Sequence, residues 1–179
     1  MRKSHLKKLI KETIKPLNER YLNFFDKEEL RPYIDEVFDI MQRTYEPIGG
    51  FKTARTPEEL LSKAGFAKLV RKEGRIVAAA VYKDQRGRKA IAKGYDGSEI
   101  GKRSVVQIYK EDAKMNRSWG EFSGKPEAIM LKYGAVPVHN DAVEAILGKP
   151  IESKDADGFH YIRLIKGEPY RKILIGNVK

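Results

Sequence analysis

Three β-rich stretches follow one another closely in the middle of the chain, at residues 66–71, 75–83 and 89–95. The segments between them, 72–74 and 84–87, both end in glycine and have the composition of hairpin turns. Parallel strands need crossover connections of about a dozen residues or more, whereas antiparallel strands need only a short turn. The sequence therefore predicts an antiparallel meander.

Helical patterns precede the meander. Residues 1–17 alternate leucine and isoleucine with lysine at helical spacing, which predicts a basic amphipathic helix ending near Pro16. A second helix is expected to begin at Asp26, with Glu29 in the capping-box position, and to end at 46–50. Its expected apolar face consists of Leu30, Ile34, Val37, Phe38 and Met41. A short third helix is expected from the Thr56 cap, with Pro57 at its first position, Glu59 as the reciprocal acid and Gly65 as its stop.

Helices and strands alternate after the meander. A glycine-rich turn with Ser98 as cap opens a helix that runs to about Lys114. We then expect a strand at 118–122, a helix at 126–133 stopped by Gly134, a strand at 136–138, a short helix within 140–148, and strands at 159–165 and 170–175. The 179 residues suffice for one ordinary domain. The sequence thus predicts a mixed α/β (α+β) fold, with a mostly antiparallel twisted sheet of about six or seven strands flanked by helices.

Composition excludes several classes of protein. The longest apolar run, 76–82, is far shorter than the roughly 20 residues that span a bilayer, and the basic start lacks the features of a signal peptide. We therefore expect a soluble, cytoplasmic protein without membrane contact. The chain has no cysteine and three histidines, which excludes disulfides and thiol nucleophiles and makes us expect no metal site.

The charge is positive and unevenly distributed. Lysine and arginine number 36 against 25 acidic residues, a formal net charge of +11. Residues 1–20 and 66–103 are rich in basic side chains, whereas 21–40 hold six acidic and two basic residues. Nucleic acid, coenzyme A or an acidic protein surface would each complement this charge. The alternative is that the lysines only form solvated faces.

The glycine turn before the helix at 99–114 is the strongest candidate site. Main-chain amides at a helix start bind anions without any particular side chain, and Gly97 and Gly101 would let a phosphate approach closely. A P-loop is excluded, because Asp96 stands where its first glycine would be and Arg103 replaces its Ser/Thr. A dinucleotide fingerprint is excluded because the turn follows a hairpin. A purely structural turn is the alternative.

The order of elements resembles that of the GCN5-related N-acetyltransferases, the GNAT family, over roughly residues 26–178. In that family two helices precede an antiparallel meander, a diphosphate-binding loop and helix follow it, and a strand, helix, strand and final strand come last. The family's Q/R-x-x-G-x-G/A loop would fall on 95–102, where the glycines are kept at a wider spacing. Residues 123–135 resemble the family's N-x-x-A-x-x-x-Y-x-x-x-G-F segment. There, Ser123 replaces Asn, Pro126 replaces Ala, Ala135 replaces Phe, and Met130 stands where the Tyr proton donor would be.

The resemblance implies attack of an amine on the thioester of acetyl-CoA, without a covalent enzyme intermediate. The implied cofactor-binding residues are Tyr95, Gly97, Ser98, Gly101, Lys102 and Arg103. Glu121 is the implied base, on a strand facing the cofactor channel, and Tyr133 replaces the missing acid if its ring turns into the site. A salt-bridged Glu121 and a core Tyr133 are the alternatives. The acceptor would be an amine-bearing small molecule or protein.

Other features leave alternatives open. His139 and His160 could carry protons or be ordinary loop and strand residues, and Trp119 could stack on a substrate or lie in the core. Residues 119–124 and 157–161 resemble segments of uncharacterised phage-encoded sequences. Residues 1–25 would be a basic, helical extension, and 26–179 the GNAT-like acyltransferase domain. The alternative function is a catalytically silent, GNAT-like basic protein that binds nucleic acid or an acidic partner.

Overall fold

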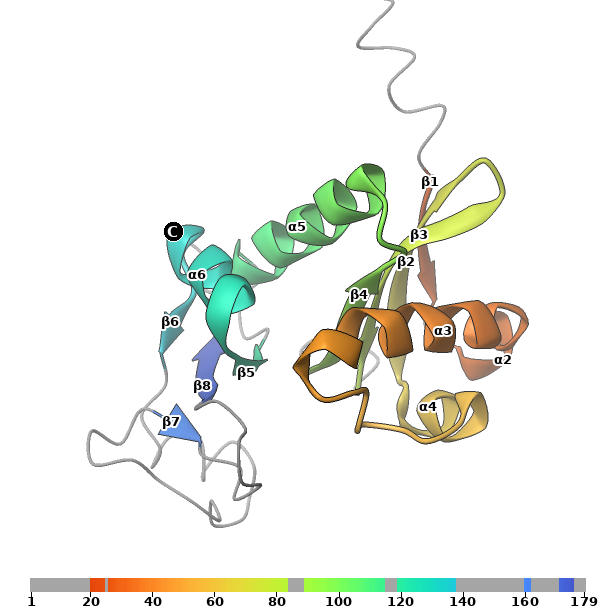
Figure 1. Ribbon diagram of the computed structural model, residues 1–179, viewed down its shortest axis with the longest axis horizontal. Coiled ribbons are helices and arrows are strands. Elements are labelled where there is room, and N and C mark those ends of the chain that lie inside the picture. Colours follow the sequence, from red (N-terminus) through yellow and green to blue (C-terminus); the bar gives the residue numbers. More distant parts are fainter. Residues whose placement is uncertain are drawn as a thin grey trace, which may run out of the picture. The chain divides into compact units, whose positions relative to one another are not determined.

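The computed structural model describes residues 20–24, 26–83, 89–114, 119–137, 160–161 and 171–175 (Figure 1). The predicted helices at 1–17 and 140–148 and the turn at 84–87 lie outside these residues. The chain divides into two compact units. The first comprises residues 1–86 and 92–105, and the second comprises 87–91 and 106–179.

The first sheet contains four strands in the order β1-β2-β3-β4. Their bounds are β1 Arg20–Phe24, β2 Phe66–Lys72, β3 Arg75–Tyr82 and β4 Ala90–Tyr95. β1 pairs with β2, and β2 with β3, in antiparallel register. Glu73 and Gly74 join β2 to β3 with φ angles of 50° and 81°, and the left-handed backbone at both positions explains the glycine. The predicted antiparallel pairing of β2 with β3 is confirmed, and β4 lies next to β3 in the sheet. β1 was not predicted, and its five residues fall in the segment assigned to the extension.

The helices of the first unit begin with α2 (Lys27–Leu30), the 3-10 turn η1 (Arg31–Tyr33) and α3 (Ile34–Tyr45). The expected single helix is thus interrupted, because Pro32 has no amide hydrogen to continue the ladder. Asp26 caps α2 as predicted, accepting from the Glu28 amide at 2.7 Å. The 3-10 turn η2 (Glu46–Ile48) ends at Gly49, which has a φ of 98°. In α4 (Pro57–Lys63), Thr56 Oγ1 accepts from the Glu59 amide at 3.2 Å.

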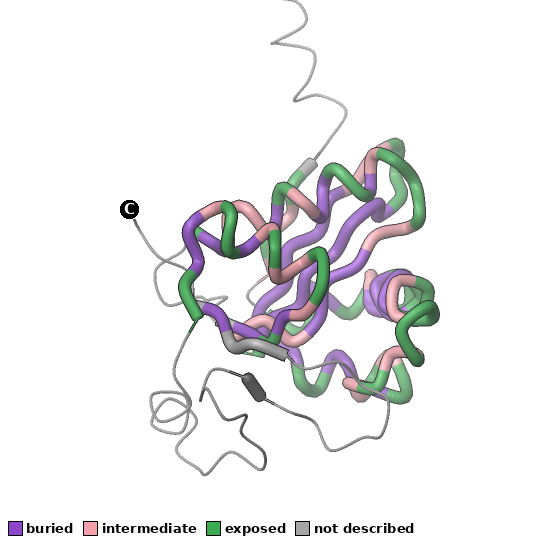
Figure 2. The backbone as a smooth tube through the Cα atoms, turned by 60° about the vertical axis from the view of Figure 1, so that its left-hand side comes forward, coloured by how far each residue is buried: buried purple, intermediate pink, exposed green. Residues whose placement is uncertain are grey.

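The core of the first unit lies between α3 and the sheet. Every predicted residue of the apolar helical face is buried, and Ile40 is buried with them. β2 is buried from Phe66 to Val70 and β3 from Ile76 to Tyr82, so both faces of these strands are covered (Figure 2). α4 packs against α3. Such continuous burial is typical of central strands.

The second unit contains a second sheet in the order β5-β8-β6, with β7 also paired to β8. Its elements are β5 Trp119–Phe122, α6 Gly124–Lys132, β6 Val136–Pro137, β7 His160–Tyr161 and β8 Arg171–Ile175, and α5 (Glu99–Lys114) runs from the first unit into it. β8 pairs antiparallel with all three neighbours, so the last strand of the chain is central. Gly134, with a φ of 110°, follows α6 as predicted.

The predicted mixed α/β class, with antiparallel strands and flanking helices, is confirmed. The strands are divided between two sheets of four in the described residues. The core of the second unit is formed by side chains from α5, β5, α6 and β8 and from the residue that precedes β6. These side chains, the core cluster, are Ala113, Phe122, Met130, Leu174 and Ala135.

Candidate functional site

The end of β4 is fixed by α3. Thr44 Oγ1 accepts from the Tyr95 amide at 3.0 Å and donates to the Tyr95 carbonyl at 3.2 Å. At Gly94 an added Cβ would lie 2.6 Å from Thr44 Oγ1 and 3.2 Å from Met41 Sδ, so only glycine lets α3 approach this closely. The start of the predicted loop is therefore positioned by a helix that precedes it by about 50 residues.

The turn between β4 and α5 is closed by its own side chains. The Asp96 amide donates to the Val77 carbonyl at 3.0 Å. Asp96 Oδ1 accepts from the amide of Ser98 at 3.0 Å and from its hydroxyl. Ser98 Oγ in turn accepts from the Gly101 amide at 3.0 Å, which confirms Ser98 as the cap of α5.

The two glycines of the loop have different roles. Gly101 is buried, and a Cβ there would collide with the Val77 carbonyl and the Asp96 carboxylate. Its lack of a side chain lets α5 pack on β3, and its amide is already bonded to Ser98. Gly97 is exposed, has a φ of 92°, and has no atom within 4 Å of an added Cβ. The open approach that the sequence predicted at both glycines is present at Gly97.

Part of the loop fits a diphosphate. The amides of Glu99 and Ile100 are the first two of α5 and, within the described part of the chain, have no acceptor in the protein. Lys102 is exposed, with Nζ 3.9 Å from Glu99 Oε1. Arg103 is also exposed. The Asp96 carboxylate opposes an anion, because it carries negative charge at the same helix end.

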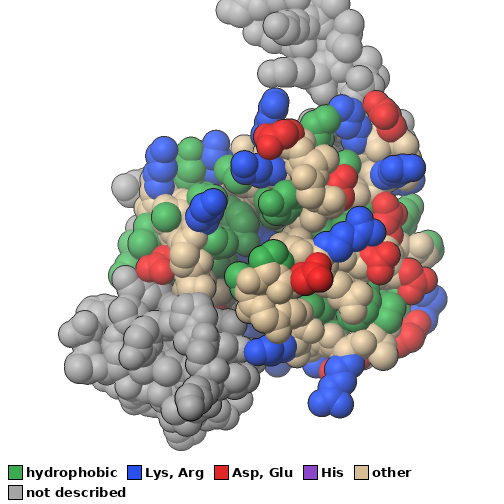
Figure 3. All heavy atoms as spheres, viewed as in Figure 1, with side chains coloured by type: hydrophobic (Ala, Val, Ile, Leu, Met, Phe, Trp, Pro, Cys, Tyr) green, Lys and Arg blue, Asp and Glu red, His purple; other side chains and the backbone are tan. Residues whose placement is uncertain are grey.

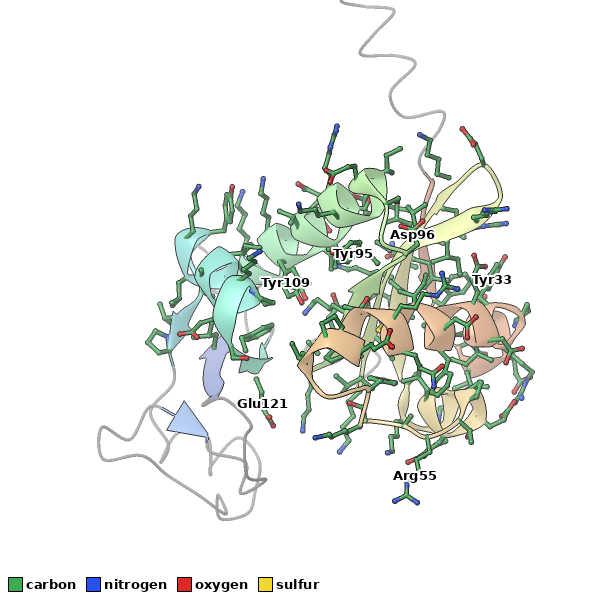
Figure 4. All side chains as sticks on the ribbon, viewed as in Figure 1. Tyr33, Arg55, Tyr95, Asp96, Tyr109 and Glu121 are labelled. Atoms are coloured by element: carbon green, nitrogen blue, oxygen red, sulfur yellow. The ribbon has the colours of Figure 1, made fainter. Side chains whose placement is uncertain are left out.

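Glu121 and Met130 lie in the second unit. Glu121 is exposed on β5, between buried Gly120 and Phe122, so its side chain is on the face opposite the core cluster; Figure 4 shows it pointing away from α6. Met130 is fully buried in that cluster. The position of the family's proton donor therefore holds a core side chain.

Tyr133 combines core packing with a polar hydroxyl. Its half-buried ring packs against the core cluster, and Lys110 Nζ lies 4.7 Å from the ring centroid. A hydrogen bond from Lys110, with the positive charges of Lys110, Lys132 and Lys114, lowers the pKa of Tyr133 below its ordinary value of 10.0. The cofactor-binding and catalytic roles of the predicted residues stay predictions.

Two buried lysines were not predicted. Lys68 and Lys93 are 8% and 3% exposed, and their Nζ atoms lie 5.8 and 5.4 Å from the Tyr82 ring centroid. The charge pattern of the sequence placed both in a positive region, 66–103. Apolar neighbours on both sides of Lys68 in β2 were the available signal of its burial.

The structure describes little of the remaining candidate residues, the two histidines and the tryptophan. His139 and the side chains of Trp119 and His160 lie outside what the structure describes. Among the described residues, no group of three or more His, Cys, Asp or Glu side chains could hold a metal ion. Over the same residues, no helix is both long and apolar enough to span a membrane.

Three solved structures share this general architecture at low identity. A polyamine N-acetyltransferase from Drosophila melanogaster is 15% identical, with a TM-score of 0.44 over 87% of this chain and 99% of that one. An agmatine N-acetyltransferase, solved as a mutant in its apo form, is 13% identical, with a TM-score of 0.43 over 87% and 98%. The C-terminal domain of a protein described as a lysylphosphatidylglycerol synthetase, from Agrobacterium fabrum, is 14% identical, with a TM-score of 0.38 over 59% and 35%.

This chain thus spans about a third of the last of these structures. No protein-family model matches the chain, and no curated protein matches it in sequence. At 13–15% identity and TM-scores below 0.5, the likeness concerns the arrangement of helices and strands and says nothing about chemistry.

Proposed function

We propose that the chain transfers an acetyl group from acetyl-CoA to an amine. The observation that carries this proposal is the β4–α5 connection: a meander strand leads through an open glycine into a long helix whose first amides are available. β5, α6 and β6 follow, and β8 lies between β5 and β6. This is the order of elements that the GNAT resemblance implies.

In this proposal the amides at the start of α5 hold the diphosphate, with Gly97 giving it room and Lys102 and Arg103 adding positive charge. The amine nitrogen attacks the thioester carbonyl carbon, the carbon–sulfur bond breaks, and the thiolate leaves. Before the attack, Glu121 takes one proton from the acceptor's ammonium group, directly or through water, which frees the lone pair of the nitrogen. The leaving thiolate takes up the second proton that the nitrogen loses as the amide forms. The acceptor is a small amine or a protein amine, and the cytoplasm is the expected location. The resemblance to phage sequences plays no part in the proposal.

The second candidate is a protein that binds nucleic acid or an acidic protein partner and catalyses no reaction. Two observations favour it: Met130 is a buried core residue, and the Asp96 carboxylate lies at the site of the diphosphate. Such a protein would bind acetyl-CoA weakly or not at all and would show no turnover. Binding and turnover are therefore measured separately.

The test compares two glycines that both have a positive φ angle. Gly97 and Gly74 have φ angles of 92° and 81° and open space at the Cβ position, so Gly97→Ala and Gly74→Ala should each cost about 1–2 kcal/mol of stability. We expect Gly97→Ala alone to weaken acetyl-CoA binding, by roughly tenfold or more, in calorimetric titration of folded protein. Equal affinity of both variants and the wild type would remove the loop from the proposal. Weak or absent binding of acetyl-CoA by the wild type, together with no acetylation of any amine tested, would favour the second candidate.

A further inference from the structure

Three lysines converge on one phenol at the surface of the second unit. Lys110 and Lys114 are one turn apart on α5, and Lys132 is the last residue of α6. The Nζ atoms of Lys110 and Lys132 lie 4.7 and 5.8 Å from the centroid of the Tyr133 ring. Lys114 and Lys132 are exposed, and Lys110 and Tyr133 are half-buried. We call these four residues the lysine cluster.

The cluster is not neutralised within the described part of the chain. No carboxylate there lies within ion-pair distance of its three lysines. Within the described residues, the charges that shift the pKa of Tyr133 are those of Lys110, Lys132 and Lys114. Gln107 donates to Glu111 at 3.3 Å, so that acid is engaged along the helix.

Helix dipoles account for only part of this arrangement. Lys114 and Lys132 lie in the last turn of their helices, where a positive charge is favourable, and Lys110 lies one turn earlier on α5. Each helix end offers about half a negative charge, whereas the cluster brings three full positive charges together. Lys110 and Lys114 are moreover at i,i+4 spacing, which is unfavourable for like charges. An external anion would remove the remaining repulsion.

We propose that the lysine cluster is a binding surface for the phosphate backbone of nucleic acid. Figure 3 shows lysine and arginine side chains gathered over the region of α5 and α6. The ammonium groups and the Tyr133 hydroxyl are all hydrogen-bond donors for phosphate oxygens. A duplex carries one negative charge per about 1.7 Å, about twice the density of an extended acidic peptide, and suits a chain with a net charge of +11. None of the three lysines belongs to the proposed acetyl-CoA site.

The experiment compares two triple variants of the full chain that lose the same charge. One carries Lys110→Gln, Lys114→Gln and Lys132→Gln. The control carries Lys52→Gln, Lys72→Gln and Lys83→Gln, at positions in the first unit, two of them in the basic region 66–103. Circular dichroism and thermal melts establish that both fold. Binding of a labelled duplex of random sequence is measured by fluorescence anisotropy between about 50 and 200 mM salt.

We expect the cluster variant to lose affinity roughly tenfold or more at low salt. Its slope of log affinity against log salt should also become shallower by about 2 to 3, which is about one unit for each phosphate that the variant no longer neutralises. The control variant should keep most of the slope. Equal losses in both variants would overturn the proposal, and so would an absence of salt-sensitive binding by the wild type. A polyglutamate peptide that binds the cluster as tightly as the duplex would assign the surface to an acidic protein and also overturn it.

Discussion

Asp96 and Ser98 together satisfy some of the polar groups that open α5, but not the amides of Glu99 and Ile100. Asp96 accepts from the amide and hydroxyl of Ser98, and Ser98 accepts from the Gly101 amide. This arrangement stabilises the turn but places a carboxylate at the positive end of the helix. The charge therefore stabilises the protein and opposes any anion that binds beside it.

Replacing Asp96 by asparagine separates these two effects. The amide oxygen of Asp96→Asn can still accept from Ser98, but the negative charge is gone. We expect acetyl-CoA to bind about 2- to 10-fold more tightly, while the protein loses about 0.3–1 kcal/mol of stability from the helix end. Calorimetric titration and denaturant melts measure the two changes.

The matched control is Glu111→Gln, which removes one negative charge from the same helix about three turns after its start. Its affinity for acetyl-CoA should stay within about twofold of the wild type, because salt screens the interaction of charges separated by more than about 10 Å near the surface. Weaker binding by Asp96→Asn would show that the carboxylate helps to hold the ligand.

The role of a single residue could be predicted from the sequence where that role depends only on residues close to it along the chain. The Ser98 cap, the Thr56 cap and the turn at Gly74 depend on bonds or φ angles within a few residues. The burial of Lys68 and Lys93 could not be predicted, because it depends on what covers the strands. The close packing at Gly101 could not be predicted either, because its neighbour Val77 lies in β3, far from it in sequence.

At the scale of elements, α3 holds the candidate site in place. Its inner face is buried against the sheet, and its last turn bonds to the end of β4 through Thr44. Tyr95 takes part in both hydrogen bonds of this contact, directly before Asp96. The geometry of the turn therefore depends on a helix–strand contact that is distant in sequence.

Removing the Thr44 hydroxyl tests this contact. Thr44→Val keeps the shape of the side chain but leaves the Tyr95 amide and carbonyl without their partner. We expect a loss of about 1–3 kcal/mol in the free energy of unfolding, measured by urea denaturation. Thr53→Val is the control, since none of its hydrogen bonds uses the Thr53 hydroxyl. That variant should change stability by no more than about 0.5 kcal/mol. Equal stabilities of the two variants would mean that Thr44 does not hold β4.

The sequence predicted which segments form helices or strands better than it predicted which strands pair with one another. The periodicity of residues 34–45 and 66–82 predicted α3, β2 and β3, because long periodic patterns outweigh local exceptions. β1 has only five residues, and pairing with β2 makes it a strand. The insertion of β8 between β5 and β6 had no local signal, since register is set by partners far along the chain.

At the scale of the whole molecule, exposed carboxylates form ion pairs with some of the many basic side chains and so reduce the repulsion between positive charges. Arg31 bridges Glu28 and Glu58, and Lys63 pairs with Glu59 at 2.7 Å. The hydrogen bond from Arg31 and its charge lower the pKa of Glu28. The hydrogen bond from Lys63 and that from the Arg55 amide lower the pKa of Glu59. These acids thus remain charged in the folded protein at a lower pH than in the unfolded chain.

A carboxyl with a lowered folded pKa stabilises the protein above its unfolded pKa, near 4.5, and this contribution is lost as the pH falls through the folded pKa. Below that range, most of the 25 acids are neutral and the 36 lysines and arginines repel one another. We therefore expect the melting temperature to fall steeply below about pH 4.5. Added sodium chloride should raise it more at about pH 4 than at about pH 7, because salt screens repulsion between exposed charges. Differential scanning calorimetry at both pH values measures this, with sucrose at equal osmolality as the uncharged control. An equal effect of salt at both pH values would contradict the prediction, since acid unfolding would then arise from buried groups whose interactions salt does not screen.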